Sequence, residues 1–436
     1  MVLYLYISSN DSSEDTNRIL RYSCDKNGIL SLSDGGSIRS GGEGINNNTH
    51  GKLGPNDNDT PLVIDRARKL LFSVNGHSDT IAVLKIDEDG ALSHVEGSPF
   101  HSHGVMPNSL SIAGDTLLAS NRNEDYHRPE LLRDENGASY VSFKVDKNGH
   151  LNHVEKILIA GGHKPTQIHF AQSTGSIAFG NDFQVDADFD GDGTRSLLAG
   201  AATSVQGQLH SFVVSEKSEL TEIERIAVPE TNGEYSYLGM DGVPSLPLGL
   251  WTHPTQNILY VGFVTRNEVG VFEFVDGAKL KFVGSVKNSG QDICWLLTNR
   301  AGTRLYTINN LPRKEYGDSG SSVTTYDITG DKARLPVEIH RIVLPSEAAA
   351  FRNNRNLMQP GSTAFQCCLS PSEEFLFVIA QRINQTEENT STSGNGVFTL
   401  LIDENGVPSA ISDYRDLLSD GVAARCRPQG LACLEL

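Results

Sequence analysis

Short runs of alternating apolar and polar residues recur along the whole chain. Many of them end in the pattern Asp-x-x-Gly-x-Leu, which is clear at 25–30, 87–92 and 146–151 and weaker at 275–280 and 403–407. Asn-Gly and Asp-Gly between alternating segments favour a tight hairpin, because both turn positions accept a positive φ. The pattern therefore predicts antiparallel β-strands joined by short turns.

A second apolar element, similar to Leu-Tyr-Val-Asn, precedes these turns and recurs seven times. Its copies lie at 70–75, 117–121, 259–262, 305–309 and 375–378, with degenerate versions at 3–7 and 176–181. Proline often begins the preceding strand, where a missing N–H is tolerated. These prolines are Pro61, Pro107, Pro165, Pro247 and Pro428. The repeat predicts seven units of four strands, each averaging about 62 residues, which suits propeller blades with long loops.

The two ends of the chain complement each other in this scheme. The segment 3–34 supplies three strands, and 428–436 supplies a single strand that would pair with them. Such pairing closes the ring and removes a free edge strand. The sequence thus predicts an all-β fold, a seven-bladed β-propeller of four-stranded blades whose C-terminal strand joins the N-terminal blade. The predicted single domain spans 1–436, with blades at 1–35 plus 428–436, 60–98, 107–158, 165–229, 247–287, 291–345 and 361–418.

Composition narrows the classes of partner. The apolar runs of four to eight residues are far below the ~20 that cross a bilayer, so no membrane partner is expected. A formal net charge of −18 argues against nucleic acid, which requires clustered Lys and Arg. A small anionic substrate in a local basic pocket stays compatible with this charge. The chain carries no serine-hydrolase elbow, Gly-rich phosphate loop or dinucleotide fingerprint, so no nucleotide cofactor is expected.

Six cysteines in so long a chain do not form a disulfide framework, and no CxxC pair indicates zinc. We therefore expect a reduced, cytoplasmic protein, although Asn-x-Ser/Thr sequons leave secretion as the alternative. The vicinal pair Cys367-Cys368 falls on a predicted strand, where the two side chains face opposite sides.

The turn motif, the proline-led strands and the phrase at 97–100, Gly-Ser-Pro-Phe, resemble the lactonase family of seven-bladed propellers over essentially the whole chain. That family includes 6-phosphogluconolactonase-like hydrolases and carboxymuconate lactonising enzymes. The resemblance implies a small-molecule enzyme for lactone hydrolysis, lactonisation, or a related cyclisation or isomerisation at the mouth of the central channel. Where the family carries Pro-His-x-His or Pro-Arg-His, this chain has other residues at 107–110, 165–168 and 247–250. It therefore resembles a member that has diverged at the family's catalytic histidines.

Long insertions are expected on one face of the ring. They fall at 121–137, 181–207, 309–322 and 381–396, and at 35–60, 230–246 and 345–362. A rigid scaffold with its variable loops on one side is the usual arrangement for a binding or catalytic site. We expect the site on that face.

Three histidines on this face are candidate catalytic residues. His101, His103 and His163 are expected just before strands that line the channel. Imidazole is the natural general acid or base near neutral pH, and His-x-His can also supply two metal ligands. Solvated loop histidines are the alternative interpretation.

Arginines on the same face suit a carboxylate or an oxyanion. Arg122 and Arg425 are candidate catalytic residues. Arg427, Arg266 and Tyr237 are candidate substrate-binding residues. Surface ion pairs with the abundant acidic residues are the alternative role for most of these arginines.

Four alternate aspartates, Asp186, Asp188, Asp190 and Asp192, precede or flank glycine in the manner of a calcium loop. Hard carboxylate oxygens at this spacing suit Ca²⁺, although Leu197 stands where an EF-hand has its bidentate Glu. Ca²⁺ is therefore a candidate cofactor, and an acidic, solvated loop is the alternative.

Two classes of function follow. The first is an enzyme that acts on a small, anionic or lactone-like molecule by acid–base chemistry. The second is a non-catalytic propeller that binds a partner or acts as a scaffold, which the missing family histidines favour.

Overall fold

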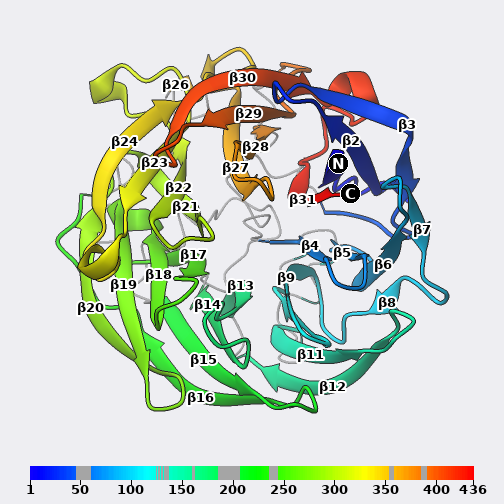
Figure 1. Cartoon of the computed structure of the whole chain (residues 1–436), viewed down its shortest axis with the longest axis horizontal. Coiled ribbons are helices and arrows are strands. Elements are labelled where there is room, and N and C mark those ends of the chain that lie inside the picture. The colour runs from blue at the N-terminus through cyan, green and yellow to red at the C-terminus, as the bar shows by residue number, and fades with distance from the viewer. Residues whose placement is uncertain are drawn as a thin grey trace.

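The computed structural model describes residues 1–45, 60–123, 125, 128, 131, 137–159, 163–184, 207–234, 244–352, 358–383 and 390–436. Within these ranges, seven sheets surround a central axis, each with its first strand innermost (Figure 1). The predicted all-β, seven-bladed propeller is confirmed.

The blades follow one another around the ring in chain order. Blade 1 contains β4 (Leu62–Asp65), β5 (Leu70–Asn75), β6 (Thr80–Ile86) and β7 (Leu92–His94), with β8 (Phe100–His101) added on β6. Blade 2 contains β9 (Pro107–Ala113), β10 (Thr116–Asn121), β11 (Ser139–Val145) and β12 (Leu151–Leu158). Blade 3 contains β13 (His163–Phe170), β14 (Ile177–Gln184), β15 (Gln208–Val214) and β16 (Leu220–Ala227). Blade 4 contains β17 (Pro247–Thr252), β18 (Ile258–Phe263), β19 (Glu268–Val275) and β20 (Lys279–Lys287).

The remaining blades complete the circle. Blade 5 contains β21 (Gln291–Thr298), β22 (Arg304–Leu311), β23 (Ser322–Asp327) and β24 (Val337–Val343). Blade 6 contains β27 (Ser362–Leu369), β28 (Phe375–Arg382), β29 (Gly396–Ile402) and β30 (Pro408–Asp416). Blade 7 contains β31 (Gln429–Glu435), β1 (Leu3–Ser8), β2 (Arg18–Cys24) and β3 (Leu30–Arg39). Short additions are the hairpin β25 (Phe351–Arg352) and β26 (Met358–Gln359), and the 3-10 turns η3 (Val264–Arg266), η4 (Lys314–Tyr316), η5 (Gly330–Ala333) and η6 (Leu418–Asp420).

Blade 7 closes the ring from both ends of the chain. β31 pairs antiparallel with β1, from Leu3 opposite Glu435 to Ser8 opposite Gln429, and the two termini lie side by side (Figure 1). The predicted closure is confirmed. It gives blade 7 four strands like the other blades, with β31 in place of β1 as the innermost strand.

Burial along each strand follows its place in the blade. Middle strands lie between two neighbouring blades, so β18 is buried at all six positions. The outermost strands have one face in solvent, and β16 alternates between buried or half-buried and exposed positions. This is the pattern that the period of two along a pleated strand produces.

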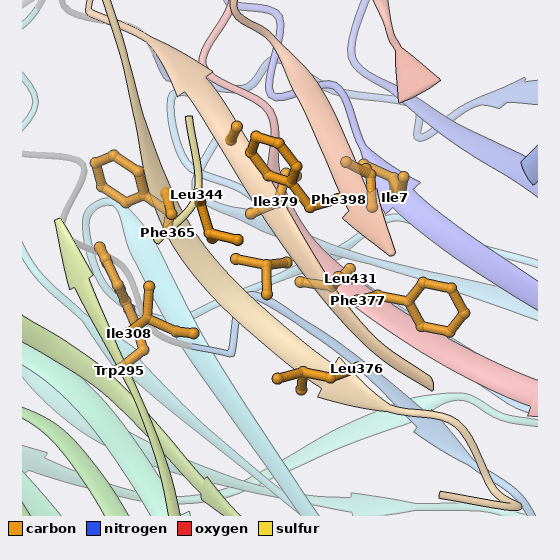
Figure 2. Packing of buried hydrophobic residues seen from close by; sticks show 14 of the residues in the cluster. Ile7, Trp295, Ile308, Leu344, Phe365, Leu376, Phe377, Ile379, Phe398 and Leu431 are labelled. Atoms are coloured by element: carbon orange, nitrogen blue, oxygen red, sulfur yellow. The ribbon is translucent and has the colours of Figure 1, made fainter. Parts of the chain in front are cut away.

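Apolar side chains fill the space between blades. In Figure 2, Trp295 of blade 5 packs on Phe365 of blade 6, with ring centroids 4.5 Å apart. Phe377 and Ile379 of β28 continue this cluster toward Ile7 of blade 7, and all three are fully buried. The core is therefore continuous across the point where the ring closes.

Side-chain amides join neighbouring blades at the end of the channel where the innermost strands begin, which we call the channel mouth. Asn108 Nδ2 of blade 2 donates to the carbonyl oxygens of Pro165 and Thr166 in blade 3, at 3.1 and 2.8 Å. Asn181 Nδ2 of blade 3 donates to Pro247 and Leu248 of blade 4, at 3.0 and 2.8 Å. These buried bonds explain the repeated prolines. A proline at this place provides a carbonyl oxygen that accepts the amide hydrogen bond, and it has no backbone N–H that would need an acceptor of its own.

A side-chain amide also donates to a proline carbonyl beside the closing strand β31. Gln381 Nε2 of blade 6 donates to the Pro428 carbonyl at 2.9 Å, and Gln381 Oε1 accepts from Arg427 Nε at 3.0 Å. Asn10 Nδ2 donates to the Arg427 carbonyl at 3.0 Å. We refer to these contacts, made by Asn10, Asn108, Asn181 and Gln381, as the amide clasps.

Leu434→Ala tests the packing of the closing strand. Leu434 is 5% exposed and packs with residues of β1, β2 and blade 1, so its truncation is expected to lower the free energy of unfolding by about 2–5 kcal/mol. Leu32→Ala, at a 36% exposed position of β3, is the matched control and should change it by less than about 1 kcal/mol. Urea denaturation measures both. Equal effects of the two variants would contradict this packing.

Candidate functional site

His163 and Asp182 meet at the channel mouth of blade 3. His163 begins the innermost strand β13, and Asp182 lies on the adjacent strand β14. His163 Nδ1 is 2.7 Å from Asp182 Oδ1; the Asp182 side chain is fully buried, whereas that of His163 is 13% exposed. A carboxylate only accepts, so Nδ1–H of His163 is the donor.

A line of charged groups continues from Asp182 to the outside of the blade. Asp182 Oδ2 is 2.5 Å from Nε2 of His210 on β15, and His210 Nδ1 is 2.6 Å from Glu222 Oε1 on β16. Glu222 in turn accepts from Arg225 Nε at 3.1 Å. One residue from each of the four strands thus forms the relay His163–Asp182–His210–Glu222.

The relay fixes the charge of its members. Burial opposes ionisation of Asp182, but hydrogen bonds from His163 and His210 and their charge lower the pKa of Asp182 to about 2. Burial also opposes protonation of His210, yet Asp182 and Glu222 raise the pKa of His210. Both ring nitrogens of His210 face carboxylates, so this buried ring is held as an imidazolium.

His163 is the one ring of the relay with a nitrogen left for chemistry. Among the described residues, its Nε2 has no hydrogen-bond partner, while Nδ1–H is held by Asp182. An imidazole oriented through Nδ1 by a buried carboxylate can take a proton at Nε2 and return it. The arrangement suits a general base that then becomes a general acid.

Two buried basic side chains lie at the mouth ends of blades 2 and 3. Lys164 follows His163, is 2% exposed, and its Nζ donates to the Asn123 carbonyl at 2.7 Å. Arg122, fully buried after β10, places its guanidinium 5.3 Å from the ring centroid of Phe183 on β14. The predicted residues Arg122 and His163 therefore lie at the same end of neighbouring blades.

Arg427 lies just before the closing strand β31, at the same end of the channel. It is 1% exposed, and its guanidinium lies 5.2 Å from the ring centroid of Phe365. Its Nε bond to Gln381 makes it part of an amide clasp. Arg427 thus contributes to the joint between blades 6 and 7.

The other predicted arginines lie in ion pairs. Arg266 binds Glu230 at 2.8 Å. Arg425, with a 48% exposed side chain, binds Asp11 at 3.1 Å. Burial raises the pKa of Asp11, but the Ser13 backbone N–H and the Arg425 guanidinium outweigh this effect, so the pKa of Asp11 is lowered. Exposed pairs of this kind contribute little to stability and leave the arginine engaged.

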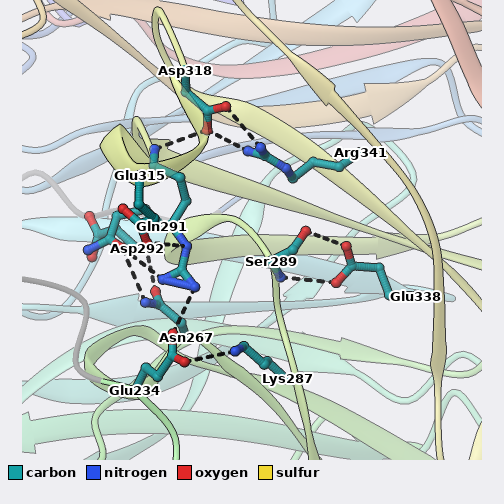
Figure 3. Close-up of polar contacts among 11 residues, drawn as sticks. Glu234, Asn267, Lys287, Ser289, Gln291, Asp292, Glu315, Asp318, Glu338 and Arg341 are labelled. Atoms are coloured by element: carbon teal, nitrogen blue, oxygen red, sulfur yellow. Dashed lines mark hydrogen bonds and ion pairs between the residues drawn. The ribbon is translucent and has the colours of Figure 1, made fainter.

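Blades 4 and 5 carry a further set of such pairs. Arg313 lies 2.9 Å from Glu234 and 3.1 Å from Glu315. Figure 3 shows two further pairs, Lys287 with Glu234 and Arg341 with Asp318. The cations of this region are matched by acidic groups.

His101 and His103 do not join His163 at the channel mouth, where the sequence led us to expect them. Residues 100–101 form β8 on β6, so the innermost strand of blade 2 begins only at Pro107. His103 instead stacks on His153 of the outermost strand β12, with ring centroids 4.1 Å apart. Burial and the neighbouring His153 and His101 lower the pKa of His103 to about 4.

Tyr237 and the aspartates of the predicted calcium loop, Asp186, Asp188, Asp190 and Asp192, lie outside the described residues. In the described part of the chain, no three His, Cys, Asp or Glu side chains form a group that could hold a metal ion. Calcium binding stays a prediction. Asp182, beside that loop, has both carboxylate oxygens occupied by histidines.

One histidine cluster was not expected from the sequence. His77 Nδ1 is 2.6 Å from Asp125 Oδ2, and its Nε2 is 3.4 Å from Glu43. Arg128 binds both Asp125 and Asp79, at 2.6 and 2.5 Å. The hydrogen bond from His77 to Asp125 raises the pKa of His77. Both its nitrogens face carboxylates, so this cluster braces blades 1 and 2 and differs from His163.

The positions of Lys164, His210 and Glu222 near the channel mouth and in the relay were not predicted from the sequence. Each lies on a strand whose alternating pattern predicts burial of one face, but the pattern does not say which polar residues meet across strands. The match depends on registers that shift, between Pro165 and Gln167 on β13 and between Ser211 and Phe212 on β15. A histidine at a buried strand position was the available signal.

No protein-family model matches the chain, and no curated protein matches its sequence. Solved structures with a similar fold include a protein of unknown function from Desulfotomaculum acetoxidans, with TM-score 0.60, 11% identity and 99% of each chain covered. A candidate 6-phosphogluconolactonase from Bacteroides fragilis has TM-score 0.59 and 14% identity over 100% of this chain and 98% of its own.

The periplasmic gluconolactonase of Pseudomonas aeruginosa has TM-score 0.56 and 16% identity over 80% of this chain and 82% of its own. Identities this low establish a shared fold and nothing finer. The resemblance to lactonase propellers is therefore supported at the level of architecture. No helix in the described ranges is long and apolar enough to cross a membrane.

The Asp182→Asn variant tests the relay through its pH dependence. A carboxyl with a lowered pKa contributes stability that is present above its ordinary pKa of 3.8 and is lost as the pH falls through about 2. We expect Asp182→Asn to be less stable than the natural chain by about 2–3 kcal/mol at pH 5. This gap should shrink as the pH approaches 2.

Urea denaturation at a series of pH values between 5 and 2 measures the gap. Asp34→Asn, at an exposed position of β3, is the matched control and should leave the stability unchanged. A gap for Asp182→Asn that stays constant over this range would contradict an ionised Asp182 held by two histidines.

Proposed function

We propose that this chain is an enzyme that acts on a small, lactone-like anionic molecule by acid–base catalysis at the channel mouth. The observation that carries the proposal is the geometry of His163. Its Nδ1–H donates to buried Asp182 at 2.7 Å, and its Nε2 lacks a partner among the described residues. His77, which braces blades 1 and 2, has both nitrogens facing carboxylates instead.

The same groups support lactone hydrolysis. Nε2 of His163 takes a proton from water as the water oxygen attacks the lactone carbonyl, and Asp182 stabilises the imidazolium that forms. The proton then passes from Nε2 to the ring oxygen as the carbon–oxygen bond breaks, which yields the hydroxy acid. Ring closure is the reverse sequence with the same residues.

Two buried cations at the same end of the channel suit the charge of such a reaction. Arg122 and Lys164 come from adjacent blades, and their charges act in a medium that screens them weakly because both are buried. Both groups can donate charge-assisted hydrogen bonds to a carboxylate or phosphate of the substrate, or to the oxyanion of the tetrahedral intermediate. Buried cations at the mouth of an acidic chain therefore favour an anionic substrate.

Proteins of the same fold indicate which substrates to test first. The Bacteroides fragilis protein is a candidate 6-phosphogluconolactonase, and the Pseudomonas aeruginosa protein is a gluconolactonase. Glucono-δ-lactone and its 6-phosphate are therefore the first substrates to test, and the phosphate additionally tests the preference for an anion.

His163→Gln is expected to lower kcat/KM for a hydrolysed lactone by about 10²–10⁴-fold, because glutamine keeps a donor toward Asp182 and removes the base. His153→Gln on the outermost strand β12 is the matched control and should keep the natural rate. Acid release is followed with a pH indicator after subtraction of spontaneous hydrolysis. Full activity of His163→Gln, or no turnover of either lactone by the natural chain, would instead favour a binding module.

Arg122→Gln tests the role of the buried cation. We expect KM for the phosphorylated lactone to rise about tenfold or more, since a charge-assisted hydrogen bond contributes about 1.5–3 kcal/mol. Arg39→Gln, at a 58% exposed side chain paired with Asp15, is the control. An unchanged KM in Arg122→Gln would remove this arginine from substrate binding.

A further inference from the structure

A cavity lies in the central channel, away from the mouth. Its volume is about 340 Å³, and residues of all seven innermost strands line it. His169 of its wall is six residues beyond His163 on β13, which corresponds to about 20 Å along a strand. The volume is within the range of about 300–1,000 Å³ that small-molecule pockets occupy.

One wall of this cavity is flat and aromatic. The imidazole of His169 stacks on the indole of Trp251, with ring centroids 4.4 Å apart and planes 28° apart. Burial lowers the pKa of His169 to about 3, so the ring is neutral. Trp251 Nε1 donates to Thr298 Oγ1 at 3.1 Å, so the polar edge of the indole is paired and the ring contributes apolar surface to the cavity lining.

Most other polar atoms of the lining are already paired. Gln366 Oε1 accepts from the Gly430 backbone N–H at 2.9 Å, and Ser111 Oγ accepts from that of Phe170 at 2.9 Å. Aliphatic side chains such as Ile112 and Leu431 supply much of the remaining surface. A sugar lactone with its many hydroxyl groups would find few free partners here, whereas an apolar ring would bury well.

The electrostatic character of the cavity is set by one cation. Arg66, which is exposed and follows β4, is the charged residue among the described lining residues, and no acidic side chain lines the cavity with it. The hydrogen bond from Cys368 and the charge of the nearby Arg66 guanidinium lower the pKa of the Cys433 thiol. Burial opposes this effect but does not outweigh it. The positive charge therefore lies at the cysteine side of the cavity, at the end of the channel opposite the mouth.

We propose that this cavity binds a small planar aromatic carboxylate. The ring lies against the Trp251–His169 pair, and the carboxylate pairs with Arg66 at the open end. The site is separate from the one at the channel mouth, so it does not depend on the function proposed for His163.

Intrinsic fluorescence tests this binding directly, because both tryptophans of the chain, Trp251 and Trp295, line the cavity. Three probes separate the determinants: benzoate is planar and anionic, benzyl alcohol is planar and neutral, and cyclohexanecarboxylate is anionic and not planar. We expect benzoate to change the fluorescence saturably and at least tenfold more tightly than either of the others.

Arg66→Gln should weaken benzoate binding about tenfold and leave that of benzyl alcohol unchanged, while Arg39→Gln on blade 7 should change neither. His163→Gln should retain benzoate binding, which separates this test from that of the mouth. Equal affinity for the three probes, or benzoate binding that Arg66→Gln leaves unaltered, would overturn the proposal.

Protection of cysteines gives a second readout that does not use fluorescence. Cys367, Cys368 and Cys433 line the cavity, whereas Cys24 does not. Saturating benzoate is expected to slow alkylation of the half-buried Cys367 and Cys368 by iodoacetamide in peptide mass mapping, with cyclohexanecarboxylate at the same concentration as the control. Unchanged alkylation of both at saturating benzoate would place the ligand elsewhere and overturn the assignment.

Discussion

The amide clasps at the channel mouth are the contacts on which the remaining geometry depends. Asn108, Asn181 and Gln381 each insert a buried side-chain amide between two blades and donate to a proline carbonyl, as Asn181 does with Pro247 at 3.0 Å. A buried amide that lost these acceptors would cost about 1–3 kcal/mol, so neighbouring blades are fixed in one relative position. Asn181 is next to Asp182, and the clasp therefore also places the relay.

Charge is organised locally in a strongly acidic chain. Most arginines of the ring's rim are matched with Asp or Glu, as Arg266 and Arg425 are. At the mouth ends of blades 2 and 3, Arg122 stacks on Phe183 and Lys164 donates to a backbone carbonyl. At the other end of the channel, Arg66 lies beside an aromatic and aliphatic lining. The net charge of −18 therefore does not describe the local charge at either end of the channel.

The fold could be predicted because its determinants are local. Turn glycines such as Gly28, with φ of 82°, recur in five of the seven blades, apolar and polar residues alternate along the strands, and the unpaired strand at 428–436 indicates closure. The site could be predicted only where position along a strand decides it, as for Arg122 and His163 at strand ends. His101 is misplaced because β8 prolongs blade 1 by one strand, which no turn residue announces. Asp182, His210 and Glu222 meet through shifted cross-strand registers, which a single sequence does not encode in readable form.

The central claim is that Asp182 fixes the proton of His163 on Nδ1 and leaves Nε2 as the base. A long-range ¹H–¹⁵N spectrum of the imidazole rings, assigned with His163→Gln, measures this tautomer directly. For the neutral ring, we expect a protonated Nδ1 and an unprotonated Nε2, with the preference lost in Asp182→Asn. A neutral His163 that carries its proton on Nε2 in the natural chain would contradict the account.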